Sequence, residues 1–114
     1  MNLREIARSL NLVPVSAEVL LDREVTGCYV CDIMSRAMRA GRRGDLWVTV
    51  QAHVNVVAIA ALLDLAGVLI VEGSEIDGPT LAKANAEGVA LLTSALPTYQ
   101  VAGGLWSLGI GHDV

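Results

Sequence analysis

Apolar segments of strand length alternate with segments of helical pattern from residue 46 onward, and this alternation limits the possible folds. Strand character is found at 46–51, which alternates between two partly apolar faces, and at 68–71 and 89–93, which are almost wholly apolar. A helical pattern follows each strand, at 54–65, 79–87 and 97–108. Three repeats of strand and helix predict an α/β fold around a mainly parallel sheet.

The N-terminal part of the chain carries more local signals. Asn2 and Glu5 have the spacing of a capping box before an amphipathic helix, and Pro14 favours an extended conformation in its predecessor. Asp32 is placed to cap a helix that ends before Gly41. These signals predict a helix at 2–10, an extended segment at 13–15, a strand at 24–31 and a helix at 33–40.

Composition limits the size of the fold and its partners. A chain of 114 residues is expected to form one domain, residues 1–114, and its 54% hydrophobic and 18% charged residues exclude disorder. The surplus of apolar residues favours subunit contacts. A net charge of -4 and a pI near 4.9 argue against the basic surface of a nucleic-acid binder, so no nucleic-acid partner is expected.

The sequence also bears on compartment and membrane insertion. Two cysteines are too few for a disulfide scaffold, and the charged, amphipathic start does not resemble a signal peptide, so a cytoplasmic location is expected. The uncharged run 88–112 contains Pro97 and five glycines, and the run 46–63 is interrupted by polar residues. Neither is typical of a helix that faces lipid, so no membrane association is expected.

Loops at the carboxyl ends of the predicted strands are the expected ligand face, because α/β sheets usually bind ligands there. One such loop brings together Gln51, His53 and Asn55, and the next contains Gly73. An amide, an imidazole and a second amide at one strand end are typical of ligand contact. The alternative is that His53 or Asn55 only caps the following helix, and the sequence leaves both interpretations open.

Residues around the second strand supply further candidates. Arg23 can bind a phosphate or carboxylate through two guanidinium nitrogens, with Thr26 and Asp32 orienting the anion. The alternative is that this segment is only a charged turn at the start of the strand. We therefore include all three residues in the predicted ligand site.

Cys28 and Cys31 form a C-x-x-C pattern. On an extended strand these side chains point to opposite faces and lie about 10 Å apart, whereas a disulfide needs Cα atoms within about 7 Å. Buried structural cysteines are the preferred interpretation, with a metal site or a reactive Cys31 as alternatives. We expect no metal and no cofactor.

Motifs that perform chemistry are absent from the chain. The sequence contains no G-x-x-x-x-G-K-[ST], no G-x-G-x-x-G after a strand and no G-x-S-x-G. The sequence therefore contains none of these motifs for nucleotide hydrolysis, dinucleotide chemistry or serine hydrolysis. Asp32 and His53 remain only as a weak acid/base pair, so we expect no enzymatic activity.

Three segments resemble a stand-alone DRTGG-domain protein: residues 21–27, which include Asp22, Arg23, Thr26 and Gly27, residues 44–60, and residues 100–105. The resemblance spans about residues 1–110, and such domains are similar to the N-terminal domain of HPr kinase/phosphorylase. It implies a three-layer α/β/α regulatory or interaction domain that often dimerises. The kinase activity itself is not implied, because it needs a separate domain with a P-loop.

These observations together predict a ligand-sensing regulatory domain. The expected ligand is a nucleotide or another small anionic metabolite at the carboxyl ends of the strands. Self-association is expected through apolar helix faces with Val57, Ala61 and the pair Gly103–Gly104, where close packing of another backbone would explain two glycines inside a helix. The alternative is a protein-binding accessory factor of a metalloenzyme, associated with a hydrogenase and without a small ligand.

Overall fold

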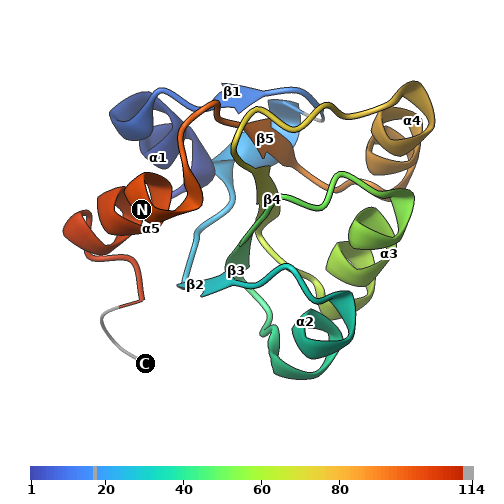
Figure 1. The fold of residues 1–114 in the computed structure, drawn as a ribbon, viewed down its shortest axis with the longest axis horizontal. Helices are drawn as coiled ribbons and strands as arrows, with labels where there is room; N and C mark the ends of the chain where they lie inside the picture. Colours follow the sequence, from blue (N-terminus) through green and yellow to red (C-terminus); the bar gives the residue numbers. More distant parts are fainter. Residues whose placement is uncertain (17, 112–114) are drawn as a thin grey trace.

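A five-stranded sheet lies between two layers of helices in the computed structural model, which describes residues 1–16 and 18–111 (Figure 1). The strand order is β1-β5-β4-β3-β2, and the four strands from β2 to β5 are parallel while β1 runs antiparallel to β5. Their bounds are β1 Val13–Pro14, β2 Gly27–Val30, β3 Asp45–Thr49, β4 Gly67–Ile70 and β5 Leu91–Thr93. The predicted α/β fold with a mainly parallel sheet is confirmed.

In the described part of the chain, helices α2, α3 and α4 cover one face of the sheet, and helices α1 and α5 cover the other (Figure 1). Strands β2 to β5 are neighbours in chain order, so connections of one hand place α2, α3 and α4 on the same face. The chain then crosses to the opposite face, where α5 packs against α1. The bounds are α1 Leu3–Leu10, α2 Met34–Ala40, α3 Val54–Leu63, α4 Gly78–Glu87 and α5 Thr98–Ser107. The three-layer α/β/α arrangement is therefore present.

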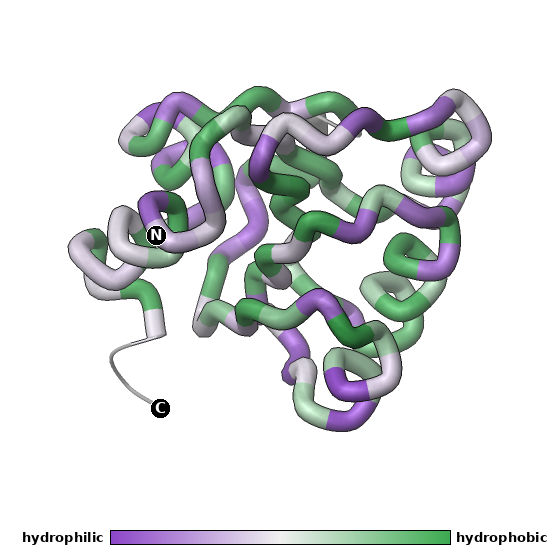
Figure 2. Tube along the Cα trace, in the orientation of Figure 1, coloured by the Kyte–Doolittle hydropathy of each residue, from purple (hydrophilic) through white to green (hydrophobic). Residues whose placement is uncertain are grey.

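Two apolar clusters fill the two sides of the sheet, and the strands in the middle of Figure 2 are correspondingly hydrophobic. Leu46 and Val48 of β3 point toward α1 and α5, whereas Trp47 points toward α2, α3 and α4. Trp47 is fully buried, and its indole N–H donates to the carbonyl of Cys31 at 2.8 Å. Burial on both faces explains why these strands are almost continuously apolar.

The capping prediction for Asp32 is wrong. Ile33 occupies the N-cap position of α2 without a side-chain hydrogen bond. One carboxylate oxygen of Asp32 instead accepts from the Thr49 hydroxyl and from the backbone N–H of Val50, both at 2.9 Å. The parallel pairing of β2 and β3 brings these donors to Asp32, and the sequence around Asp32 alone does not reveal them.

The extent of β2 and the packing of Gly104 also differ from the predictions. Strand β2 begins only at Gly27, because Val25 donates to the Met1 carbonyl and Thr26 to the Gly44 carbonyl. In α5 a side chain, rather than a backbone, packs against Gly104: a Cβ added there would lie 2.8 Å from a methyl carbon of Leu10. A short 3₁₀ helix, η1 (Glu18–Asp22), was not predicted.

No helix within residues 1–16 and 18–111 is long and apolar enough to cross a membrane. The uncharged run 88–112 is divided among β5, α5 and their connections. Its last residue, His112, lies outside the described residues.

Candidate functional site

The seven predicted ligand residues are divided between the two edges of the sheet. All parallel strands end at one edge, the carboxyl edge, and begin at the opposite, amino edge. Arg23 and Thr26 precede β2 and therefore lie at the amino edge. The carboxyl edge holds the others: Asp32, Gln51, His53, Asn55 and Gly73. The prediction that Arg23 joins Gln51 and His53 at one site is therefore wrong.

Arg23 belongs to an ion-pair group that we call the amino-edge clamp, formed by Arg23, Arg43 and Asp64. The Arg23 guanidinium donates to the Asp64 carboxylate at 2.9 Å and to the Asp64 carbonyl at 2.6 Å. Arg43 contacts the other carboxylate oxygen at 2.8 Å. Asp64 ends α3 in a left-handed conformation, so the clamp fixes the end of that helix to the segment before β2.

Thr26 and Gly27 also serve the packing of the amino edge. The Thr26 hydroxyl donates to the Arg43 carbonyl at 3.4 Å. A Cβ added at Gly27 would lie 2.5 Å from a carboxylate oxygen of Asp45, so a larger residue there would have to displace that carboxylate. The residues that resemble the DRTGG motif thus connect three segments of the amino edge.

His53 caps α3, a role that the sequence had left open beside ligand contact. Its Nδ1 accepts from the backbone N–H of Asn55 at 3.0 Å. The side chains of Gln51 and His53 border a hollow under the start of α3 that has no room for a water molecule. That hollow is therefore too small to hold a ligand.

Asn55 borders a groove between α2 and α3, which we call the α2–α3 groove. Its volume is about 740 Å³. Apolar side chains of both helices form most of its wall, and Arg36 and Arg39 of α2 add two guanidinium groups. The residues that line it are Ile33, Met34, Ser35, Arg36, Met38, Arg39, Asn55, Ala58, Ile59 and Leu62.

Gly73 borders a second space, which we call the β4–β5 pocket, of about 510 Å³. The connection after β4 leads to α4 on one face, and the connection after β5 leads to α5 on the other (Figure 1). Adjacent strands whose connections diverge in this way form the usual ligand crevice of an open α/β sheet. The pocket is lined by Asn11, Val13, Val15, Gly73, Ser74, Ile76, Leu81, Thr93, Ser94 and Ala95.

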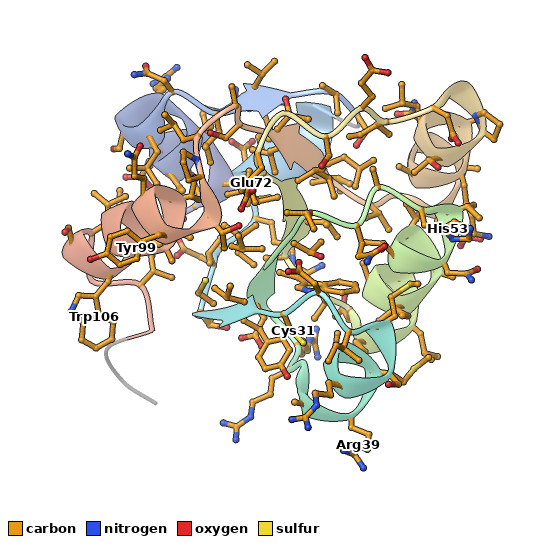
Figure 3. The ribbon with its side chains drawn as sticks, in the orientation of Figure 1. Cys31, Arg39, His53, Glu72, Tyr99 and Trp106 are labelled. Atoms are coloured by element: carbon orange, nitrogen blue, oxygen red, sulfur yellow. The ribbon has the colours of Figure 1, made fainter. Side chains whose placement is uncertain are left out.

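Glu72 fills the part of this crevice next to α5, and sequence reasoning missed it. With a positive φ of 61°, its N–H donates to the Leu96 carbonyl at 3.0 Å, and its carboxylate accepts from both the N–H and the hydroxyl of Thr98. These bonds to Thr98 lower the pKa of Glu72. The start of α5, where the helix dipole favours an anion, is therefore occupied by a carboxylate of the chain itself (Figure 3).

The electrostatics of the β4–β5 pocket favour an uncharged group. Glu72, Glu75 and Asp77 follow one another in the connection from β4 to α4. Asp77 caps α4 by accepting from the Thr80 N–H at 2.9 Å. The hydrogen bonds of Asp77 with the Thr80 side chain and backbone lower the pKa of Asp77. None of the described residues that line the pocket carries a charge. The lining therefore offers a phosphate no ion pair.

The two cysteines are both free and half-buried. Burial, together with the carboxylate of Asp45, raises the pKa of the Cys28 thiol to about 11, so little thiolate forms at neutral pH. The Cys31 sulfur accepts from the backbone N–H of Ile33 at 3.4 Å. Within the described part of the chain no group of three or more His, Cys, Asp or Glu side chains is placed to hold a metal ion.

Comparison with known proteins identifies a similar fold. No protein family and no curated protein matches the sequence. A solved structure of the CBS and DRTGG domains of the regulatory region of Clostridium perfringens pyrophosphatase, complexed with the activator diadenosine tetraphosphate, matches with a TM-score of 0.70 and 11% identity. The match covers 90% of this chain and 44% of that chain. The predicted resemblance to a DRTGG-containing protein is confirmed at the level of the fold.

Replacement of Asp64 tests the amino-edge clamp through the pH dependence of stability. The hydrogen bond from Arg23 lowers the pKa of Asp64 below its ordinary 3.8 in the folded protein. The ionised clamp therefore adds stability above that ordinary value, and the contribution is lost as the pH falls through the lower folded-state pKa. We expect urea unfolding to show a smaller loss of stability between about pH 6 and pH 2 for Asp64→Asn than for wild type.

Asn tolerates the left-handed backbone at position 64, so this variant removes the charge without new strain. Asp22→Asn is the control, because it removes only an exposed ion pair with Arg4. Equal loss of stability with pH in wild type and Asp64→Asn would contradict the role of the clamp.

Proposed function

We propose that the chain is a non-catalytic regulatory domain that senses a nucleotide, whose nucleoside part binds in the β4–β5 pocket. The observation that carries this proposal is a pocket of about 510 Å³ at the point where the connections after β4 and β5 diverge. Small-molecule sites usually have volumes of about 300–1,000 Å³. The pocket is therefore large enough for a base and its ribose.

The chemistry of the pocket fits a nucleoside better than a free anion. Val13, Ile76 and Leu81 provide apolar walls for a planar base. Ser74 and Asn11 provide a hydroxyl and an amide for a base edge or a ribose. Gly73, with a positive φ of 69° and no atom near its missing Cβ, leaves the backbone open to close approach.

The fold neighbour supports a regulatory role. That region of the clostridial pyrophosphatase is regulatory and was solved with a nucleotide activator. The present chain spans less than half the length of that solved chain, 44%. In the described part of this chain, the two groups considered as an acid/base pair are engaged otherwise: Asp32 accepts from Thr49 and Val50, and His53 caps α3. A role without catalysis therefore fits the site best.

Thermal unfolding in the presence of adenosine, AMP, ATP and diadenosine tetraphosphate tests this proposal. A ligand at about 100 times its Kd adds roughly 2.7 kcal/mol, which raises Tm by several degrees in a domain of this size. We expect adenosine to raise Tm about as much as the phosphorylated compounds, because the acidic surroundings of the pocket offer phosphate no partner. Ala95→Trp should abolish the shift by filling the pocket from its exposed rim.

The control for this experiment is Ala86→Trp, which adds the same ring at an exposed position of α4 away from the lining residues. It should retain the full shift. If no compound raises Tm, or if Ala95→Trp responds like wild type, the proposed nucleoside site is refuted.

Self-association forms a second part of the proposal, and its surface keeps Gly103 from the predicted faces but not Val57. Val57 is fully buried, so it is not available for a subunit contact. The outer face of α5 carries Tyr99, Gly103 and Trp106 at helical spacing, and the two aromatic side chains are 88% and 61% exposed (Figure 3). Helix α5 contains no charged residue, which suits contact between two copies that each carry a net charge of -4.

Gly103→Glu tests this surface. No atom lies near the missing Cβ of Gly103, and glutamate favours helix more than glycine, so the variant is expected to fold. Light scattering at micromolar concentration should show a dimer for wild type and a monomer for Gly103→Glu, because the new charges repel across a two-fold interface. A monomeric wild type would disprove self-association at that concentration.

A further inference from the structure

The α2–α3 groove is a second extended concavity with a mostly apolar lining, and neither the nucleoside pocket nor the α5 face uses it. Ile33, Met38 and Leu62 are 54%, 42% and 70% exposed along it, although each is a large hydrophobic residue. Such a contiguous exposed apolar surface is typical of an interaction site. Its volume of about 740 Å³ exceeds that of the β4–β5 pocket.

Positive charge is concentrated beside this groove. Of the eight Lys and Arg residues in the chain, four lie within positions 36–43: Arg36, Arg39, Arg42 and Arg43. No acidic residue occurs between Asp32 and Asp45. Arg36 and Arg39 line the groove, and neither forms an ion pair with a described residue. In a chain with a net charge of -4, the two guanidinium groups of Arg36 and Arg39 give this groove a local positive charge that favours an acidic partner.

The shape of the groove indicates a helical partner. Two neighbouring helices form its walls, and an amphipathic helix places its apolar side chains into such a groove at positions i, i+3, i+4 and i+7. Met34 and Met38 supply flexible side chains that adapt to different partner residues. Arginines at the rim then meet carboxylates on the polar face of the partner helix.

We propose that the α2–α3 groove binds an acidic amphipathic helix of a partner protein. A second copy of this chain does not supply that helix from its described residues, because the apolar face of α1 is buried and α5 has no charge. Helix α4 does not supply the acidic helix either, because its single acidic residue, Glu87, pairs with Lys83. The occupant is therefore a different protein, and the site is independent of the nucleoside pocket.

A designed peptide of about 15 residues, with leucine at i, i+3, i+4 and i+7 and glutamate at most other positions, provides the probe. Fluorescence anisotropy with the full chain should show binding at micromolar Kd that weakens as the salt concentration rises. Leu62→Glu and the double variant Arg36→Glu/Arg39→Glu should each weaken binding by about tenfold or more. Both changes are at exposed positions, so the fold is retained.

Arg8→Glu is the matched control, because it reverses an exposed charge on α1 in the opposite layer, and it should leave Kd unchanged. Equal binding of a scrambled peptide with the same composition would overturn the proposal, as would the absence of binding. Stronger binding to vesicles that contain phosphatidylserine, or to inorganic polyphosphate, would identify a lipid surface or a polyanion as the occupant. A dimer that Leu62→Glu converts to a monomer would identify a second copy.

Discussion

Burial of both faces of the central sheet is the constraint on which the rest of this structure depends. Strands β3 and β4 are shielded on one side by α1 and α5 and on the other by α2, α3 and α4, so Leu46, Trp47 and Leu69 are all fully buried. Polar chemistry is therefore confined to the edges of the sheet and to the outer surfaces of the helices. The same constraint sends α4 and α5 to opposite faces, which creates the β4–β5 pocket.

Local patterns in the sequence predicted the structural features that depend on residues close together in the chain. The capping box at Asn2, the extended segment at Pro14 and the end of α4 at Gly88 are all present. Contacts between distant segments were not predictable in this way. Arg23 and Asp64 lie 41 positions apart, and only the fold brings them to the same edge. The sequence predicted an anion site at Arg23 because it does not reveal whether a guanidinium is already paired with a carboxylate of the same chain.

The distribution of charge explains why the candidate site also had to be revised. The carboxylates of Glu72 and Asp77 accept hydrogen bonds from the first turns of α5 and α4. Arg23 and Arg43 form ion pairs with Asp64 at the end of α3. What remains is an uncharged pocket at one end of the sheet and a basic, apolar groove on the side of α2. In the function proposed for this chain, the pocket recognises the ligand and the groove contacts a partner protein.

Mapping of backbone amide signals by nuclear magnetic resonance during a titration with adenosine tests the central claim most directly. If the nucleoside binds in the β4–β5 pocket, the largest shifts fall in residues 73–76 and 93–95, which border it. Signals of residues 51–55 should change little, because these residues do not line the β4–β5 pocket. Shifts confined to residues 51–55, or centred on the α2–α3 groove at residues 33–39, would contradict it.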